Sequence, residues 1–119
     1  MTKNVYYNKL IRDGIPDKIA RNNGTFEVRE LNQEEFVQEL SKKIIEEAYE
    51  LAHAKSREEF LSEYADLMIV LDACTREFEF SEADIKTAVE ENLKKKGAYT
   101  KRLFLHFSSD DNYPRNETQ

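Results

Sequence analysis

Apolar positions recur at helical spacing through most of the chain, and polar positions separate them. This pattern predicts three long helices, at about residues 32–54, 57–78 and 81–97. Asn32 with Glu35 and Ser81 with Asp84 have the spacing of capping boxes, which places two of the three helix starts. A short helix is expected at residues 16–24, because it would begin at a proline and end at a glycine.

Two further segments read as extended chain. Residues 25–31, TFEVREL, alternate like a short strand, and residues 98–107, AYTKRLFLHF, are expected to lie extended and to pair with them. We therefore predict an all-α fold, an antiparallel helical bundle with a minor β element near the C-terminus. Residues 1–107 are expected to form one domain, and residues 108–119 a polar, flexible tail.

Composition narrows the class of protein. The 119 residues carry a formal charge of −6, which argues against binding to a nucleic acid polymer. No apolar stretch is long enough to span a bilayer, and no signal sequence is recognised at the N-terminus. The one cysteine, Cys74, lies in an apolar helical pattern. We expect a protein of the reducing cytoplasm, without a membrane partner.

Acidic residues enter the apolar face of the helix at 57–78. On a helical wheel that starts at Phe60, Leu67 and Leu71 lie within about 20° of zero, and Glu63 falls at about 300°, inside the apolar arc. Asp66 lies about 60° beyond Glu63, at the margin of that arc. Both carboxylates are therefore expected to face the element on which this helix packs.

The helix at 32–54 repeats this feature. From Phe36, Glu47 falls at about 20°, in the apolar stripe, and Glu50 lies about 60° away on its flank. If the two helices pack together, the four acids Glu47, Glu50, Glu63 and Asp66 converge. Their repulsion and desolvation would be costly without a cation. Oxygen ligands of this kind suit Mg²⁺, with Mn²⁺ as a substitute, and Mg²⁺ commonly joins carboxylates to phosphates.

Two other interpretations use the same residues. The acids can belong to solvated helix faces, which are common in helices rich in glutamate and lysine. Glu50 and His53 also form E-x-x-H, half of the pattern that binds two irons in helical bundles. That pattern needs a second copy, and no glutamate lies three residues before His106.

The order of acidic motifs resembles a known family. E-E-x-x-E at residues 46–50, twelve further residues and E-x-x-D at 63–66 are similar to the signature of the MazG-like all-α nucleoside triphosphate pyrophosphohydrolase superfamily. YNKLIRDGIPDKI and KKKGAYTKRLFL resemble a subgroup likened to phosphoribosyl-ATP pyrophosphohydrolase. Gly14 departs from that subgroup, which often has lysine there.

The resemblance implies a Mg²⁺-dependent enzyme that cleaves nucleoside triphosphates between the α and β phosphates, releasing a monophosphate and pyrophosphate. Glu47, Glu50, Glu63 and Asp66 would be the metal ligands. Glu46 and Glu47 would be catalytic, with Glu46 orienting or deprotonating the attacking water. A homodimer or homotetramer is implied, because sites in this superfamily are usually completed near subunit interfaces.

A triphosphate also needs cations from the protein. We expect them just after the last helix and in the N-terminal segment, where the candidate substrate-binding residues are Lys9, Arg12, Asn92, Lys96, Tyr99, Lys101 and Arg102. Two alternatives remain open at this stage. One is a phosphoribosyl-ATP pyrophosphohydrolase of histidine biosynthesis, and the other is a non-catalytic helical module whose acidic face binds a basic partner.

Overall fold

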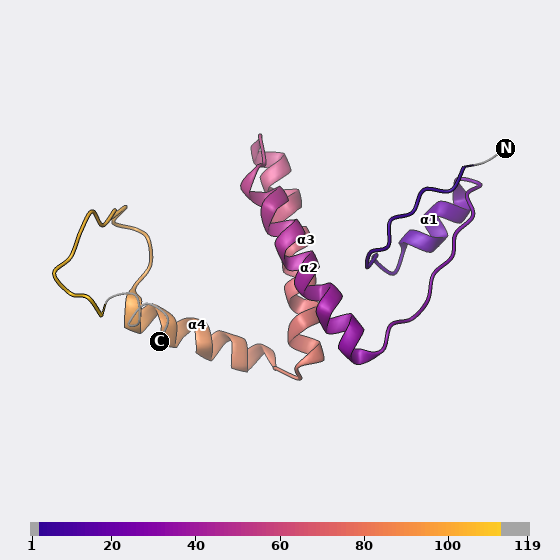
Figure 1. The fold of residues 1–119 in the computed structure, drawn as a ribbon. Helices are drawn as coiled ribbons and strands as arrows, with labels where there is room; N and C mark the ends of the chain where they lie inside the picture. Colours follow the sequence, from indigo (N-terminus) through magenta and orange to yellow (C-terminus); the bar gives the residue numbers. More distant parts are fainter. Residues whose placement is uncertain (1–2, 113–119) are drawn as a thin grey trace. The chain divides into compact units, whose positions relative to one another are not determined.

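The computed structural model describes residues 3–112 and contains four helices within them (Figure 1). Their bounds are α1 Ile15–Arg21, α2 Gln33–Ala52, α3 Arg57–Glu77 and α4 Glu82–Lys96. The all-α class is thereby confirmed for the described residues. The chain divides into two compact units, Met1–Glu79 and Phe80–Gln119.

The long helices begin where their local capping residues predict. The Asn32 side chain accepts a hydrogen bond from the Glu35 N–H at 2.9 Å, and the Glu35 carboxylate in turn accepts from the Asn32 N–H. Ser81 and Asp84 form the same reciprocal pair at the start of α4. Both predicted capping boxes are confirmed. Each satisfies backbone donors that a first helical turn would otherwise leave unpaired.

The short helix α1 ends in a tight turn at Gly24. The Gly24 N–H donates to the Ile19 carbonyl at 2.9 Å. A Cβ at this position would lie 2.6 Å from Cγ2 of Ile19, so glycine permits this close return of the chain. The sequence-based bounds of 16–24 thus contain most of α1 and its turn.

Helices α2 and α3 form an antiparallel pair joined by a connection of four residues, 53–56 (Figure 1). Leu40 of α2 and Val70 of α3 are the buried apolar residues of the described chain, with 4% and 8% of their surface exposed. The pair therefore packs around a narrow apolar seam. The first unit therefore contains two of the long helices expected in the bundle, packed as an antiparallel pair. A larger bundle stays a prediction.

The contact face of α3 is rotated from the centre of its apolar arc. Val70, at about 280° on the wheel, is buried, whereas Phe60, at zero, is 52% exposed. Tyr64 and Met68, on the far side of the arc, are 47% and 48% exposed. Glu63 and Asp66 consequently lie closer to the helix contact than the apolar pattern alone indicates.

The predicted β element is not confirmed, because the described residues contain no strand. Residues 25–31 and 98–107 are irregular chain, apart from a turn around residues 99–101. Alternation along one segment cannot supply the backbone partner that a strand requires.

The second unit contains α4 and the described residues that follow it. Ile85, Val89 and Leu93 recur at every fourth position and are 40%, 53% and 48% exposed. The predicted domain boundary at residue 107 lies inside this unit and stays a prediction. Of the predicted tail, residues 113–119 lie outside the described residues. No helix in the described part of the chain is long and apolar enough to cross a membrane.

Candidate metal centre

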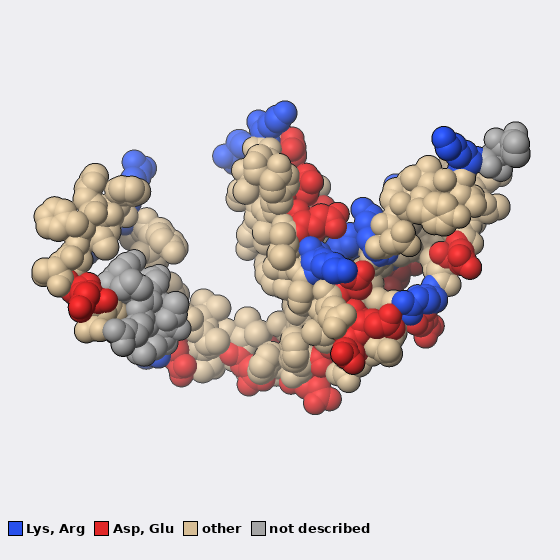
Figure 2. All heavy atoms as spheres, in the orientation of Figure 1, with Lys and Arg blue, Asp and Glu red and all other residues tan. Residues whose placement is uncertain are grey.

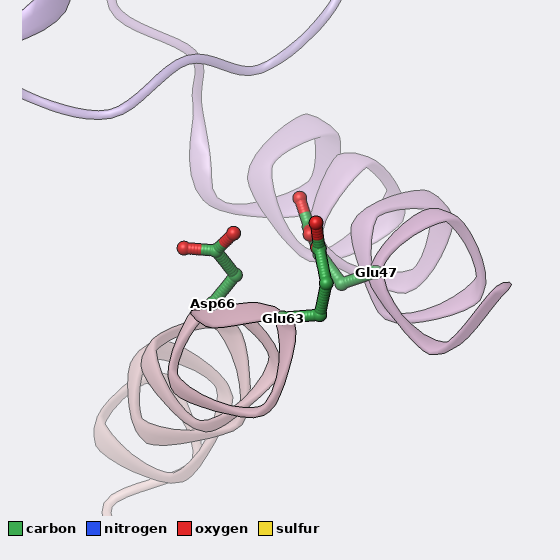
Figure 3. A group of neighbouring side chains, drawn as sticks. All are labelled: Glu47, Glu63 and Asp66. Carbon is green, nitrogen blue, oxygen red and sulfur yellow. The ribbon is translucent and has the colours of Figure 1, made fainter. Parts of the chain in front are cut away.

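Three carboxylates meet where α2 packs on α3. Glu47 comes from α2, and Glu63 and Asp66 come from successive turns of α3 (Figure 3). One oxygen from each side chain lies within 4.8 Å of the other two, and all three residues are half-buried. The antiparallel packing brings Glu47 opposite Glu63 although sixteen positions separate them in the sequence. Three of the four predicted metal ligands are thus brought together.

The fourth predicted ligand, Glu50, is exposed and lies outside this group. It is one turn beyond Glu47 on α2, on the flank of the stripe. Glu50 still acts on the cluster through space, because its charge helps to raise the pKa of Glu63. The structure therefore places Glu50 at the edge of the cluster.

The ionised forms of Glu47 and Glu63 are disfavoured by their surroundings in the cluster. Partial burial raises the pKa of Glu47, and repulsion from Asp66, Glu46 and Glu63 adds to that shift, while Lys43 opposes it. The pKa of Glu63 is raised for the same reasons, burial first and then repulsion from Asp66. A bound cation would relieve both effects.

The donor set fits a hard divalent ion. Carboxylate oxygens are the ligands that Mg²⁺ prefers, and at a bond length of about 2.1 Å two ligands lie roughly 3.0 Å apart when adjacent and 4.2 Å apart when opposite. The oxygens of Glu47, Glu63 and Asp66 already lie within 4.8 Å. These separations are compatible with one ion shared by the three carboxylates after side-chain adjustment.

Basic side chains of the N-terminal segment contact acidic residues of α2 and α3. Figure 2 shows blue and red side chains next to one another on the helix pair. Nη1 of Arg12 donates to Oδ1 of Asp66 at 3.4 Å. Nζ of Lys9 lies 3.6 Å from Oε1 of Glu46 and 5.9 Å from the centre of the Tyr7 ring. Lys9 and Arg12, both singled out by the sequence, are therefore held on the acidic face of the hairpin.

Lys43 is a residue of this site that the sequence analysis missed. Its side chain is only 16% exposed, and its Nζ lies 3.3 Å from Oε2 of Glu46. A signal existed, because Lys43 falls at about 340° on the wheel of its helix, inside the apolar stripe with Leu40 and Glu47.

Glu46 is exposed, and both of its oxygens face lysines, Lys9 on one side and Lys43 on the other. It is not part of the three-carboxylate group. The catalytic role expected for Glu46 stays a prediction, and its observed contacts are ion pairs with Lys9 and Lys43.

The remaining candidates for substrate binding belong to the second unit. Asn92 lies within α4, Lys96 is its last residue and Tyr99 is 95% exposed. Lys101 and Arg102 follow in a turn in which the Arg102 N–H donates to the Tyr99 carbonyl at 3.3 Å. Their role toward a substrate stays a prediction.

His53 is engaged by its own helix. Its Nδ1 lies 2.8 Å from the Tyr49 carbonyl, and its ring stacks on that of Tyr49 with centroids 4.1 Å apart. Glu50 and His53 join no group of metal-ligating side chains among the described residues. The site therefore gives the two-iron interpretation no support.

Comparisons with protein-family models, with curated proteins and with solved structures found no match to this chain. The class of site rests on its own geometry, a cluster of three carboxylates at a helix–helix contact with lysine and arginine beside it.

Proposed function

We propose that this chain is a Mg²⁺-dependent nucleoside triphosphate pyrophosphohydrolase that acts on the cellular nucleotide pool. The observation that carries the proposal is the meeting of Glu47, Glu63 and Asp66 on the two long helices. The order of the acidic motifs, which resembles that of the MazG-like superfamily, supports the same chemistry.

The proposed reaction is hydrolysis of the anhydride between the α and β phosphates. Water adds to phosphorus, the bridging P–O bond breaks, and the proton of water is taken up by a base as monophosphate and pyrophosphate form. A bound divalent ion supplies charge neutralisation for phosphate oxygens and lowers the pKa of water. Glu47, Glu63 and Asp66 would hold that ion, with Glu50 at the edge of the site.

Arg12 has a second role in this proposal. Its guanidinium pairs with Asp66. If Asp66 held a metal ion instead, the same guanidinium would be available beside the site to bind a phosphate oxygen.

The half-buried state of Glu47 and Glu63 favours this proposal over an acidic docking surface. A module that binds basic proteins through these residues requires them to be exposed. Phosphoribosyl-ATP remains an alternative substrate, since its hydrolysis would need the same metal site.

We further propose that the active form is a homodimer or homotetramer. The unburied part of the α3 apolar arc, including Phe60, Tyr64 and Met68, suits the corresponding surface of a second copy. Two helix pairs joined in this way form a four-helix bundle. Sedimentation equilibrium is expected to give a multiple of 14.0 kDa, and Met68→Glu to lower the mass. A monomeric mass at micromolar concentration would contradict this part.

The decisive assay measures pyrophosphate and monophosphate released from a panel of nucleotides with Mg²⁺. The panel includes canonical and modified nucleoside triphosphates and phosphoribosyl-ATP. Glu47→Gln and Asp66→Asn are each expected to abolish turnover. Glu34→Gln is the matched control, because Glu34 is exposed and lies about 20 Å away along α2. If no nucleotide is hydrolysed, or if the two site variants remain as active as the control, the proposal is wrong.

A further inference from the structure

A small cavity lies between the N-terminal segment and α2. It has a volume of about 130 Å³ and is lined by residues 8–10 together with Glu39, Lys42, Lys43 and Glu46. A site for one water needs about 10–15 Å³ on the same measure, so the space is large enough for phosphate groups.

Positive charges outnumber negative charges among the residues that line this cavity. Lys42 is paired with Glu39 at 2.8 Å. Lys9 and Lys43 share one carboxylate, Glu46, at 3.6 and 3.3 Å. The residues that line the cavity thus carry three positive and two negative charges, and Glu47, on which the Lys43 charge also acts, lies one turn beyond. If a cation balanced Glu47, a phosphate ion or ester would be the anion that suits the two ammonium groups around Glu46.

The cavity also adjoins the three-carboxylate group. Lys43 precedes Glu47 by one helical turn on α2, and its charge acts on the Glu47 carboxyl through space. One turn is about 5.4 Å. The next phosphate groups of a polyphosphate bound through a metal at Glu47, Glu63 and Asp66 would therefore lie about one helical turn from Lys43.

We propose that Lys9 and Lys43 form a subsite for the distal phosphates of the substrate, the part released as pyrophosphate. This inference rests on the proposed function and adds a binding role for Lys43. Glu46 acts in this subsite as a positioning residue, since each of its oxygens holds one of the two ammonium groups. Burial of the Lys43 stem limits its rotamers and keeps its charge directed at the cavity.

The test is calorimetric titration of the full-length protein with pyrophosphate in the presence of Mg²⁺. Lys9→Gln and Lys43→Gln are each expected to weaken binding by about tenfold, as for loss of one charged hydrogen bond. Lys43→Arg is expected to restore much of it. Lys18→Gln is the matched control, because it removes the same charge from an exposed position on α1.

Kinetics separate positioning by Glu46 from base catalysis by Glu46. In Glu46→Gln, loss of positioning raises KM and weakens inhibition by pyrophosphate, with kcat largely retained. Loss of a catalytic base lowers kcat instead, and that result would overturn the positioning role. Thermal unfolding of each variant checks that the half-buried Lys43 position tolerates the change.

Failure of this inference is distinguishable from failure of the proposed function. If the wild type hydrolyses nucleotides but both lysine variants bind pyrophosphate like the control, the subsite is wrong and the enzyme stands. If the wild type neither binds Mg²⁺ nor hydrolyses any nucleotide, the proposed function fails and the subsite fails with it.

Discussion

Neutralising Glu47 should change stability in opposite directions with and without metal. Glu47 and Asp66 carry like charges with oxygens no more than 4.8 Å apart. At that distance Coulomb repulsion is about 0.9 kcal/mol in bulk water and about 3.5 kcal/mol at an effective dielectric constant of 20. Because Asp66 is 38% exposed, solvent and salt hold the value near the lower limit, about 1 kcal/mol. Without metal, Glu47→Gln should therefore stabilise the fold by that amount.

In the presence of metal, the wild type should be more stable than Glu47→Gln. A ligand at one hundred times its Kd stabilises the native state by about 2.7 kcal/mol. The wild type should gain most of this stabilisation in Mg²⁺ or Mn²⁺, and Glu47→Gln, with one ligand oxygen replaced by an amide, should gain little. At about 4 °C per kcal/mol for a chain of this length, the wild type is expected to rise by roughly 10 °C.

The assay is thermal unfolding followed by circular dichroism, first in EDTA and then across a metal titration. Glu34→Gln serves as the control for removing one negative charge elsewhere on α2. The variant should melt above the wild type in EDTA and below it in saturating metal. If Glu47→Gln is destabilised in EDTA and gains as much from metal as the wild type, the carboxylates neither repel one another nor share an ion.

Three other outcomes follow from the same contacts. The raised pKa of Glu47 means that its charge destabilises the metal-free fold, so in EDTA the excess melting temperature of Glu47→Gln over the wild type should shrink as pH falls from neutral toward the ordinary glutamate value of 4.5. Affinity for Mn²⁺ should fall over the same range, and opposite slopes would contradict this assignment. Arg12→Gln should bind Mn²⁺ about twofold to fivefold more tightly, because Arg12 no longer pairs with Asp66; calorimetry showing equal or weaker binding would exclude that competition. Val70→Ala should lower the free energy of unfolding by about 1.5–3 kcal/mol, and Val28→Ala, at a position 54% exposed, by less than about 0.5 kcal/mol; urea denaturation measures both, and equal effects would refute the assigned core.

Local signals were sufficient to predict the helices. Capping residues act within one turn, so Asn32 and Ser81 fix the starts of α2 and α4 without information from the rest of the chain. The predicted strand depended on a partner segment. Residues 25–31 have the alternation of a strand, but their sequence does not specify which backbone they pair with, and this prediction was not confirmed.

Angles on the helical wheel were sufficient to predict part of the site. The angles of Glu47 and Glu63 placed them at a contact, and the structure brings them together. Glu50, about 60° away from Glu47, lies outside the group, because a stripe only a few residues wide meets the neighbouring helix. Lys43 was overlooked because lysine near glutamate at helical spacing is ordinary on a solvated surface. Its angle of about 340° on the wheel placed it in the apolar stripe, but the N-terminal residues that line the same cavity could not be predicted from periodicity.

The rotation of α3 connects the packing of the helix pair with the geometry of the carboxylate group. Had α3 packed through the centre of its apolar arc, Phe60 and Tyr64 would fill the seam and Glu63 would point aside. The observed packing buries Val70 instead, which sets Glu63 and Asp66 against α2 and leaves the larger side chains exposed. This arrangement gives up apolar burial within the chain and adds carboxylate repulsion, so it is favourable only where other interactions compensate. A cation between the carboxylates and a second copy over the exposed arc are two such interactions. The fold of the hairpin and its proposed chemistry therefore depend on the same packing angle, and a substitution that turns α3, such as a larger residue at Val70, should weaken metal binding even though no ligand is altered.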